Sequence, residues 1–138
     1  MSKPPSGTYV IVNKFPSPND GKLAITFNGS NQALTANIRT DSPAQRWIIR
    51  DYDAKTQSVT PVNATTLQAA WGSGYVTILP AHNYVWTIRG QDNGTGYTIQ
   101  DGGVTVFWGV AVALNNTNVT IGSGSGNDKQ KWLLERVQ

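Results

Sequence analysis

The chain has 138 residues, including 14 glycines, 7 prolines and no cysteine, and its formal net charge at pH 7 is +3. This length suits one domain with a sizeable core. The absence of cysteine excludes disulfides and cysteine-ligated zinc, and the few scattered positive charges form no basic stripe for nucleic acid. Many turn-forming residues between short β-branched runs predict an all-β fold.

The N-terminal residues 1–6 predict a loose tail. They contain no apolar stretch of the kind a signal peptide needs, and no apolar run in the chain approaches membrane-spanning length. We therefore expect a cytoplasmic protein, or one released by a non-classical route, with no membrane insertion.

The first strand is predicted at Gly7–Asn13, which is β-branched and ends at an asparagine. Asp20-Gly21 in the following loop is a hairpin signal. Further strands are predicted at Lys22–Phe27, Ala33–Ile38 and Ala44–Tyr52. No helical periodicity interrupts these strands.

The end of this first segment recurs. Trp47, which is followed by aliphatic and charged residues, has counterparts in Trp86 and Trp132. The opening Tyr9-Val10-Ile11 is echoed by Ser58-Val59-Thr60 and by Tyr97-Thr98-Ile99. Three such units, at about 7–53, 57–91 and 96–138 with linkers at 53–56 and 92–95, form an internal repeat. They predict a single β-trefoil domain over residues 1–138, with twelve short strands and the recurring tryptophan of each unit pointing inward.

The stretch from Ala70 to Trp86 concentrates aromatic residues around a glycine-rich turn. Gly72 and Gly74 leave one face of Trp71 uncrowded, and Asn83-Tyr84 adds an amide and a phenol. A flat apolar face beside fixed polar groups suits a sugar, whose C–H face packs on aromatic rings and whose hydroxyls need hydrogen bonds. The alternative is that Trp71, Tyr75 and Trp86 are core residues, and for Trp86 its repeat position favours the core.

Residues for catalysis are sparse. His82 is the single histidine of the chain, and the eight carboxylates are scattered over turns, so neither a metal site nor a glycosidase pair is indicated. No nucleophile elbow or phosphate-binding loop is present. We expect a protein that is not an enzyme and needs no cofactor.

Two motifs suggest a family. Gln45-Arg46-Trp47 and Gln130-Lys131-Trp132 are copies of a Gln-x-Trp signature, and in the second unit Tyr84 replaces the glutamine. With the runs Trp71–Gly74, Asn83–Thr87 and Gly96–Gly102, the chain resembles the ricin-B-like β-trefoil lectins of mushrooms. It is most similar to the inky-cap fruiting-body lectins that recognise the fucosylated chitobiose core of N-glycans.

This resemblance implies one sugar site per chain, in the second unit. Carried over by position, the site is lined by Tyr52, Trp71, Gly72, Leu79, Asn83, Tyr84, Val85 and Trp86, with Tyr75 and His82 less central. Trp71 and Trp86 would offer ring faces to GlcNAc. The resemblance also implies glycoprotein or glycolipid glycans as partners, a ligand containing α1,3-fucosylated chitobiose, a defence or toxin role against glycan-bearing predators, and a monomer or weak homodimer.

Other functions remain open. Asp20-Gly21-Lys22, Asp101-Gly102-Gly103 and Phe107-Trp108-Gly109 could mark sugar sites in the first and third units, although plain turns and a partly exposed aromatic explain them as well. A loop around Lys129 could enter a serine protease as an inhibitor does. A scaffold for protein–protein contact would need neither feature.

Overall fold

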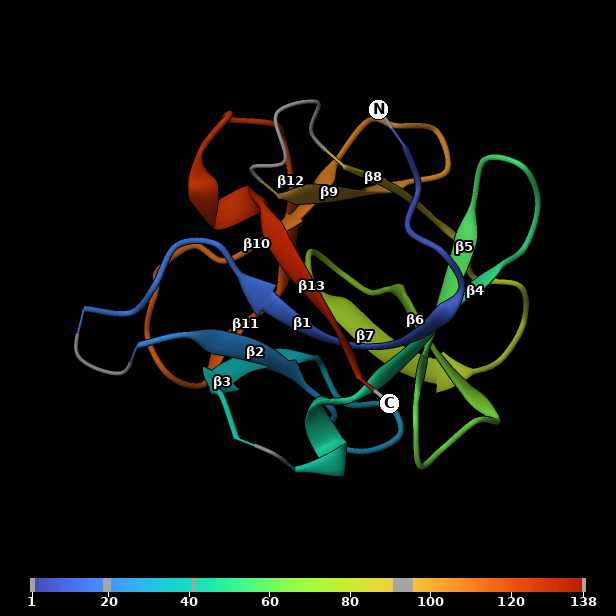
Figure 1. Cartoon of the computed structure of the whole chain (residues 1–138), viewed down its shortest axis with the longest axis horizontal. Coiled ribbons are helices and arrows are strands. Elements are labelled where there is room, and N and C mark those ends of the chain that lie inside the picture. The colour runs from blue at the N-terminus through green and yellow to red at the C-terminus, as the bar shows by residue number, and fades with distance from the viewer. Residues whose placement is uncertain (1, 19–20, 41, 91–95, 138) are drawn as a thin grey trace.

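The computed structural model describes residues 2–18, 21–40, 42–90 and 96–137. Asp20 and Asp92–Thr95, where we predicted a hairpin turn and a linker, lie outside them. The described residues form strands and two short 3-10 helices, η1 and η2 (Figure 1). These are β1 Gly7–Asn13, β2 Leu23–Thr26, β3 Thr35–Ile38, η1 Pro43–Gln45, β4 Trp47–Asp51, β5 Gln57–Pro61, β6 Leu67–Trp71, β7 Val76–Pro80, β8 Trp86–Gly90, β9 Tyr97–Asp101, β10 Phe107–Gly109, β11 Thr117–Asn118, β12 Thr120–Gly122, η2 Asp128–Gln130 and β13 Trp132–Val137.

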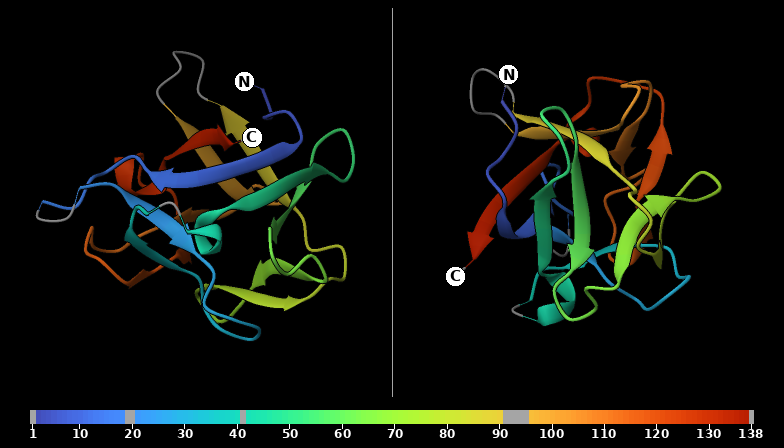
Figure 2. Two further views of the ribbon diagram at one scale, coloured as in Figure 1. Left: turned by 60° about the horizontal axis from the view of Figure 1, so that its bottom comes forward. Right: turned by 90° about the vertical axis from the view of Figure 1, so that its right-hand side faces the viewer.

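Six of these strands close into an antiparallel barrel. Around the ring, β1 pairs with β4, β4 with β5, β5 with β8, β8 with β9, β9 with β13, and β13 with β1. The left view of Figure 2 shows β1, in blue, alongside β4, in teal. The pairs β2–β3, β6–β7 and β10–β12 add one hairpin per unit. A closed barrel with three hairpins is a β-trefoil, and closure leaves its barrel strands without a free edge.

The three recurring tryptophans fill the core, which confirms their predicted inward direction. Trp47, Trp86 and Trp132 are buried. Their indole N–H groups donate to the carbonyls of Ile25, Ala69 and Trp108 at 2.9, 3.0 and 3.1 Å. Each bond joins a barrel strand to the hairpin of the same unit, so Ile25, Ala69 and Trp108 occupy equivalent places.

The register corrects our alignment of the units by one residue. Tyr9, Gln57 and Tyr97 lie opposite the three tryptophans. Val59, and not Thr60, therefore takes the buried place of Ile11. Because side chains alternate between the faces of a strand, a slip of one residue would have placed Thr60 in the core.

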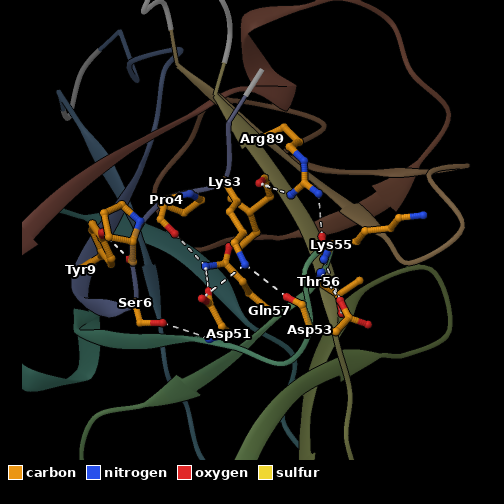
Figure 3. Close-up of polar contacts among 12 residues, drawn as sticks. Lys3, Pro4, Ser6, Tyr9, Asp51, Asp53, Lys55, Thr56, Gln57 and Arg89 are labelled. Atoms are coloured by element: carbon orange, nitrogen blue, oxygen red, sulfur yellow. Dashed lines mark hydrogen bonds and ion pairs between the residues drawn. The ribbon is translucent and has the colours of Figure 1, made fainter.

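Two further predictions were wrong. The strand predicted at Ala44–Tyr52 begins only at Trp47, because Pro43 starts helix η1 and Ser42 caps it through a side-chain bond from the Ala44 N–H. The predicted loose tail is instead an ordered strap. The Ser2 carbonyl accepts from the Gly90 N–H at 2.7 Å, and the Pro4 carbonyl accepts from the side chain of Gln57 at 2.8 Å (Figure 3). No helix among the described residues is long and apolar enough to cross a membrane.

Candidate functional site

The hairpin β6–β7 carries the predicted aromatic cluster at its tip. The Gly72 N–H donates to the carbonyl of Tyr75 at 2.8 Å. A Cβ on Gly72 would come within 2.8 Å of that same carbonyl, and Gly74 has a φ of +83°. The third unit anchors the tip, because the Ile121 N–H donates to the Gly74 carbonyl at 3.0 Å. The tip therefore requires glycine at both positions and is held rigidly.

Trp71 and Tyr75 are solvent-accessible, so the alternative that they are core residues is wrong. Trp71 is 50% exposed and Tyr75 is 44% exposed. Trp71 is the last residue of β6 and lies two positions beyond Ala69, which is fully buried. The alternation of the strand directs Trp71 toward the core side, but it stands past the edge of the core. An aromatic face is thus available on a rigid turn.

Sequence analysis missed Gln68 of β6, which holds the loop that contains His82 and Tyr84. Its side-chain oxygen accepts from the backbone N–H groups of His82 and Tyr84 at 3.2 and 3.1 Å. In the first and third units the glutamine of the Gln-x-Trp signature holds the corresponding loop: Gln45 accepts from the Thr40 N–H at 2.7 Å, and Gln130 from the Ser125 N–H at 2.8 Å. Gln68 takes over this role where Tyr84 stands in the signature.

Around Gln68 the structure brings several predicted residues together. Leu79 lies directly opposite Gln68 in the hairpin register, so the two side chains share one face. The rings of His82 and Tyr84 meet at an angle of 60° with centroids 6.3 Å apart. Asn83 has a φ of +58°, a conformation that asparagine tolerates better than most residues. Tyr84 and Val85 are half-buried.

Two patches result, one at each end of β6. Gln68 and Trp71 are three residues apart in the strand, so their side chains point to opposite faces of the hairpin. Of the aromatic ring pairs in the described residues, none joins Trp71 to Tyr84. The rings of Trp71 and Tyr84 therefore do not cover one another.

Trp86 is not part of either patch, and its prediction as a sugar-binding face was wrong. Its side chain is 2% exposed. The indole N–H is used by the Ala69 carbonyl, and the ring packs edge-to-face on Trp108 with centroids 4.9 Å apart. The core interpretation of this residue is the right one, because a buried ring has no free face for a ligand.

Tyr52 stands on a separate turn. It is 54% exposed, and its N–H donates to the Thr56 carbonyl at 3.0 Å. The Lys3 ammonium donates to the Asp53 carbonyl at 3.2 Å and lies 3.3 Å from a carboxylate oxygen of Asp51 (Figure 3). The contacts drawn there fix the turn to the N-terminal strap. They do not place Tyr52 beside the hairpin.

Two of the residues noted in the third unit, Trp108 and Asp101, have structural roles. Trp108 is the equivalent of buried Ala69, not of exposed Trp71, and is itself buried. The Asp101 carboxylate accepts from the N–H groups of Thr105 and Val106 at 2.6 and 2.9 Å. Partial desolvation raises the pKa of Asp101, but these hydrogen bonds and one from the Thr105 hydroxyl outweigh it and lower that pKa below its usual value. Within the described ranges, no three His, Cys, Asp or Glu residues group as metal ligands.

The proposed inhibitory lysine is also engaged. Lys129 belongs to η2, which the Asn127 side chain caps by accepting from the Lys129 N–H at 2.9 Å. Its ammonium lies 5.1 Å from the centre of the Phe15 ring. A half-buried lysine in a capped turn does not form the extended, protruding loop that a protease would accept.

The comparisons with known proteins agree with this fold. No curated protein sequence matches the chain. Among solved structures, the chain superposes fully on a mosquitocidal holotoxin (TM-score 0.85, 17% identity) but spans only 18% of it. Two similar structures match over nearly their whole length: the Rhizoctonia solani agglutinin (TM-score 0.76, 16% identity, 99% of each chain) and a Macrolepiota procera ricin B-like lectin in complex with lactose (TM-score 0.76, 14% identity, 99% and 100%). A family model matches residues 7–132, and the chain belongs to the CCL2 lectin-like family that this model describes.

Proposed function

We propose that the protein is a lectin that binds glycans across the second unit, between the tip of hairpin β6–β7 and the loop 81–85. The observation that carries this proposal is the half-exposed ring of Trp71 on a rigid turn beside Gly72. A ligand that covers the exposed part of such a ring removes apolar surface from water, which favours binding. Family membership supports a carbohydrate as that ligand.

The proposed ligand contains GlcNAc, and we favour chitobiose with a core α1,3-fucose. The C–H face of a GlcNAc ring, or its acetamide methyl group, would pack on Trp71. The hydroxyl of Tyr84 can donate and accept, and the backbone groups of Gly72 and Val85 would hold sugar hydroxyls. Leu79 would contact the methyl group of fucose.

Four further expected residues take different parts. Tyr75 stands on the same tip as Trp71 and would contact a sugar next to the one on the indole. His82 and Asn83 would form the rim beside Tyr84. Tyr52 would reach only a longer glycan, because its turn is tied to the strap and not to the hairpin.

The proposed biological role is defence against glycan-bearing predators by a cytoplasmic lectin. A shallow site binds a single glycan weakly, so that toxicity would depend on dense glycans or on several sites acting together. Whether the protein acts as a monomer or a weak homodimer would set that multivalency.

A glycan array tests the proposal. The wild-type protein should bind GlcNAc-containing cores, and paired glycans with and without α1,3-fucose would show whether Leu79 and Tyr75 select for it. Trp71→Ala should weaken binding at least tenfold, which corresponds to about 1.4 kcal/mol, because the stacking face is lost.

Trp71→Phe is the matched control, since it keeps a smaller aromatic face and should retain part of the affinity. Both variants change an exposed residue, so their thermal unfolding should stay close to that of the wild type. Full binding by folded Trp71→Ala, or no binding of any glycan by the wild type, would show that the proposed function is wrong.

A further inference from the structure

The third unit contains a cavity of about 340 Å³ that is separate from the hairpin β6–β7. Its walls include Thr98 and Gln100 of β9, Phe107 of β10, and Asn127, Gln130 and Lys131 around η2. Ile99 and Trp108 alternate with these residues along their strands and are buried in the core. The cavity therefore lies on the outer wall of the barrel.

Gln100 is the unusual residue of this cavity. Its side chain is only 8% exposed, and its carboxamide forms no hydrogen bond with the described residues. Within the described residues, the buried side-chain atoms without a partner are Gln57 Oε1 and Trp108 Nε1. The carboxamide of Gln100 is not among them, so it remains open to solvent in the cavity and is available to a ligand. Phe107 lies directly opposite Gln100 in the strand register, so an unpaired amide and an aromatic ring stand side by side in one cavity.

The fold does not require these residue types. The register makes Val10, Val12 and Ala24 the equivalents of Thr98, Gln100 and Phe107. In the first unit these three form a small buried apolar cluster, against which Leu133 and Val137 pack. The same position is therefore stable when it is filled with aliphatic side chains. Its polar and aromatic character in the third unit needs another explanation.

The walls of the cavity are held in place before any ligand arrives. The carboxamide of Gln130 accepts from the Ser125 N–H at 2.8 Å and donates to the Ser123 carbonyl at 2.7 Å. A Cβ on Gly124 would come within 2.5 Å of the Phe107 ring, so the backbone of this loop lies directly against that ring. A fixed ring and a fixed loop reduce the entropy lost when a ligand binds.

We propose that this cavity is a second carbohydrate site that holds one uncharged pyranose ring. The C–H face of the sugar packs on Phe107, and the carboxamide of Gln100 pairs with two neighbouring hydroxyls or with an acetamide, since it both donates and accepts. Thr98 adds a hydroxyl. The volume falls at the lower end of the range for small-molecule sites.

The charge near the cavity favours a neutral ligand. The ammonium group of Lys131 lies 3.8 Å from a carboxylate oxygen of Asp128, and the Lys14 ammonium lies 3.6 Å from the same oxygen. The positive charge at the rim is thus already partly balanced. This site is distinct from the hairpin of the second unit, and it would give each chain two places to hold glycans.

NMR titration of the isotope-labelled protein in a Trp71→Ala background tests the second site while the hairpin is disabled. The probes are the methyl glycosides of glucose, galactose, GlcNAc and GalNAc, with methyl glucuronide as a charged comparison. At least one neutral glycoside should shift the backbone signals of Thr98, Phe107 and Lys131 together. Adding Gln100→Leu should weaken that binding at least tenfold.

Gln100→Leu should remain folded, because the equivalent residue of the first unit is an aliphatic valine. Gln32→Leu, on an exposed turn of the first unit, is the matched control and should leave the titration unchanged. Three results would overturn the proposal: no coordinated shift with any neutral glycoside, shifts that survive Gln100→Leu, or a response to methyl glucuronide alone. Because the hairpin is disabled throughout, each result leaves the proposed function of the second unit untouched.

Discussion

The second unit and its two neighbours solve the same structural problem with different residues. In the first and third units, Gln45 and Gln130 hold the loop that precedes the tryptophan. In the second unit the corresponding loop is held by Gln68, which reaches across from β6. Moving the support to another strand leaves the signature position free for Tyr84. A repeat protein can thus acquire a site at one unit without giving up the contact that orders the loop.

The units share one contact in their core, although the equivalent buried residues Ile25, Ala69 and Trp108 differ in size. Each has one buried tryptophan whose N–H binds a hairpin carbonyl at nearly the same distance. The units also differ in their polar contacts at the surface. Separating the shared core contact from these surface contacts predicts which substitutions affect stability and which affect binding.

The largest expected effect comes from the shared tryptophans. Trp47→Ala and Trp86→Ala should each lower the free energy of unfolding by about 3–5 kcal/mol, because each leaves a large cavity and an unpaired carbonyl. Chemical denaturation followed by circular dichroism measures this. If Trp86→Ala kept its stability but lost glycan binding, Trp86 would be a site residue and the second unit would not depend on the shared core contact.

A smaller effect on stability is expected when a glutamine that holds one of the loops is replaced. Gln68→Ala should lower the free energy of unfolding by about 1–2 kcal/mol, because two backbone N–H groups lose their acceptor. It should also weaken glycan binding by about tenfold, because the loop carrying Tyr84 becomes less ordered. Calorimetry and the glycan array measure the two quantities.

Gln45→Ala, in the first unit, for which no sugar site is proposed, is the matched variant. It should cost similar stability and leave binding at the second unit unchanged. Equal loss of glycan binding in both variants would mean that Gln68 has no special role, and that any loosened loop impairs the protein.

The smallest expected effect concerns pH. Asn13 and Asp101 occupy equivalent strand ends, and each side chain accepts a hydrogen bond from the turn that follows, from the N–H of Phe15 and of Thr105. Only Asp101 titrates. Because its pKa is lowered in the folded state, its contribution to stability is complete above the unfolded value of about 3.9 and is lost as the pH falls through the lower folded value.

Asp101→Asn should therefore melt at a slightly lower temperature than the wild type at pH 7, and the difference should shrink as the pH falls below about 4. Thermal scans over this range provide the measurement. A difference that is constant with pH would show that the charge of Asp101 contributes nothing beyond the geometry that asparagine also provides.

The fold could be predicted from the sequence alone, because the features that determine it are either local or repeated three times along the chain. β-Branched runs and turn residues indicate the strands, and the recurrence of tryptophan indicates three units. The glycines at the hairpin tip could also be interpreted, since Gly72 and Gly74 are needed there for steric reasons. Trp71 is exposed because it lies at the end of β6. Sequence periodicity locates such a strand end only within a few residues, so the exposure of Trp71 could not be predicted with certainty.

The contacts that sequence analysis missed join residues far apart in the chain. The absence of glutamine at Tyr84 signals that the loop needs another acceptor, but nothing in the pattern singles out Gln68, sixteen residues earlier. The same holds for the strap, where Pro4 meets Gln57 across fifty-three residues. Gln100 appeared to be an ordinary strand residue, because its lack of a partner can be recognised only once its neighbours are placed in space.

The pairing of β1 with β13 has a consequence for how the protein folds. Thr8 lies opposite Val137, so β1 finds this partner only after the rest of the domain has been synthesised. Contacts between such distant segments make folding slow compared with that of helical proteins of equal size. Until then β1 presents a free edge that can pair with other chains. A shortened chain without Trp132–Val137 should therefore aggregate during synthesis and never acquire the native barrel.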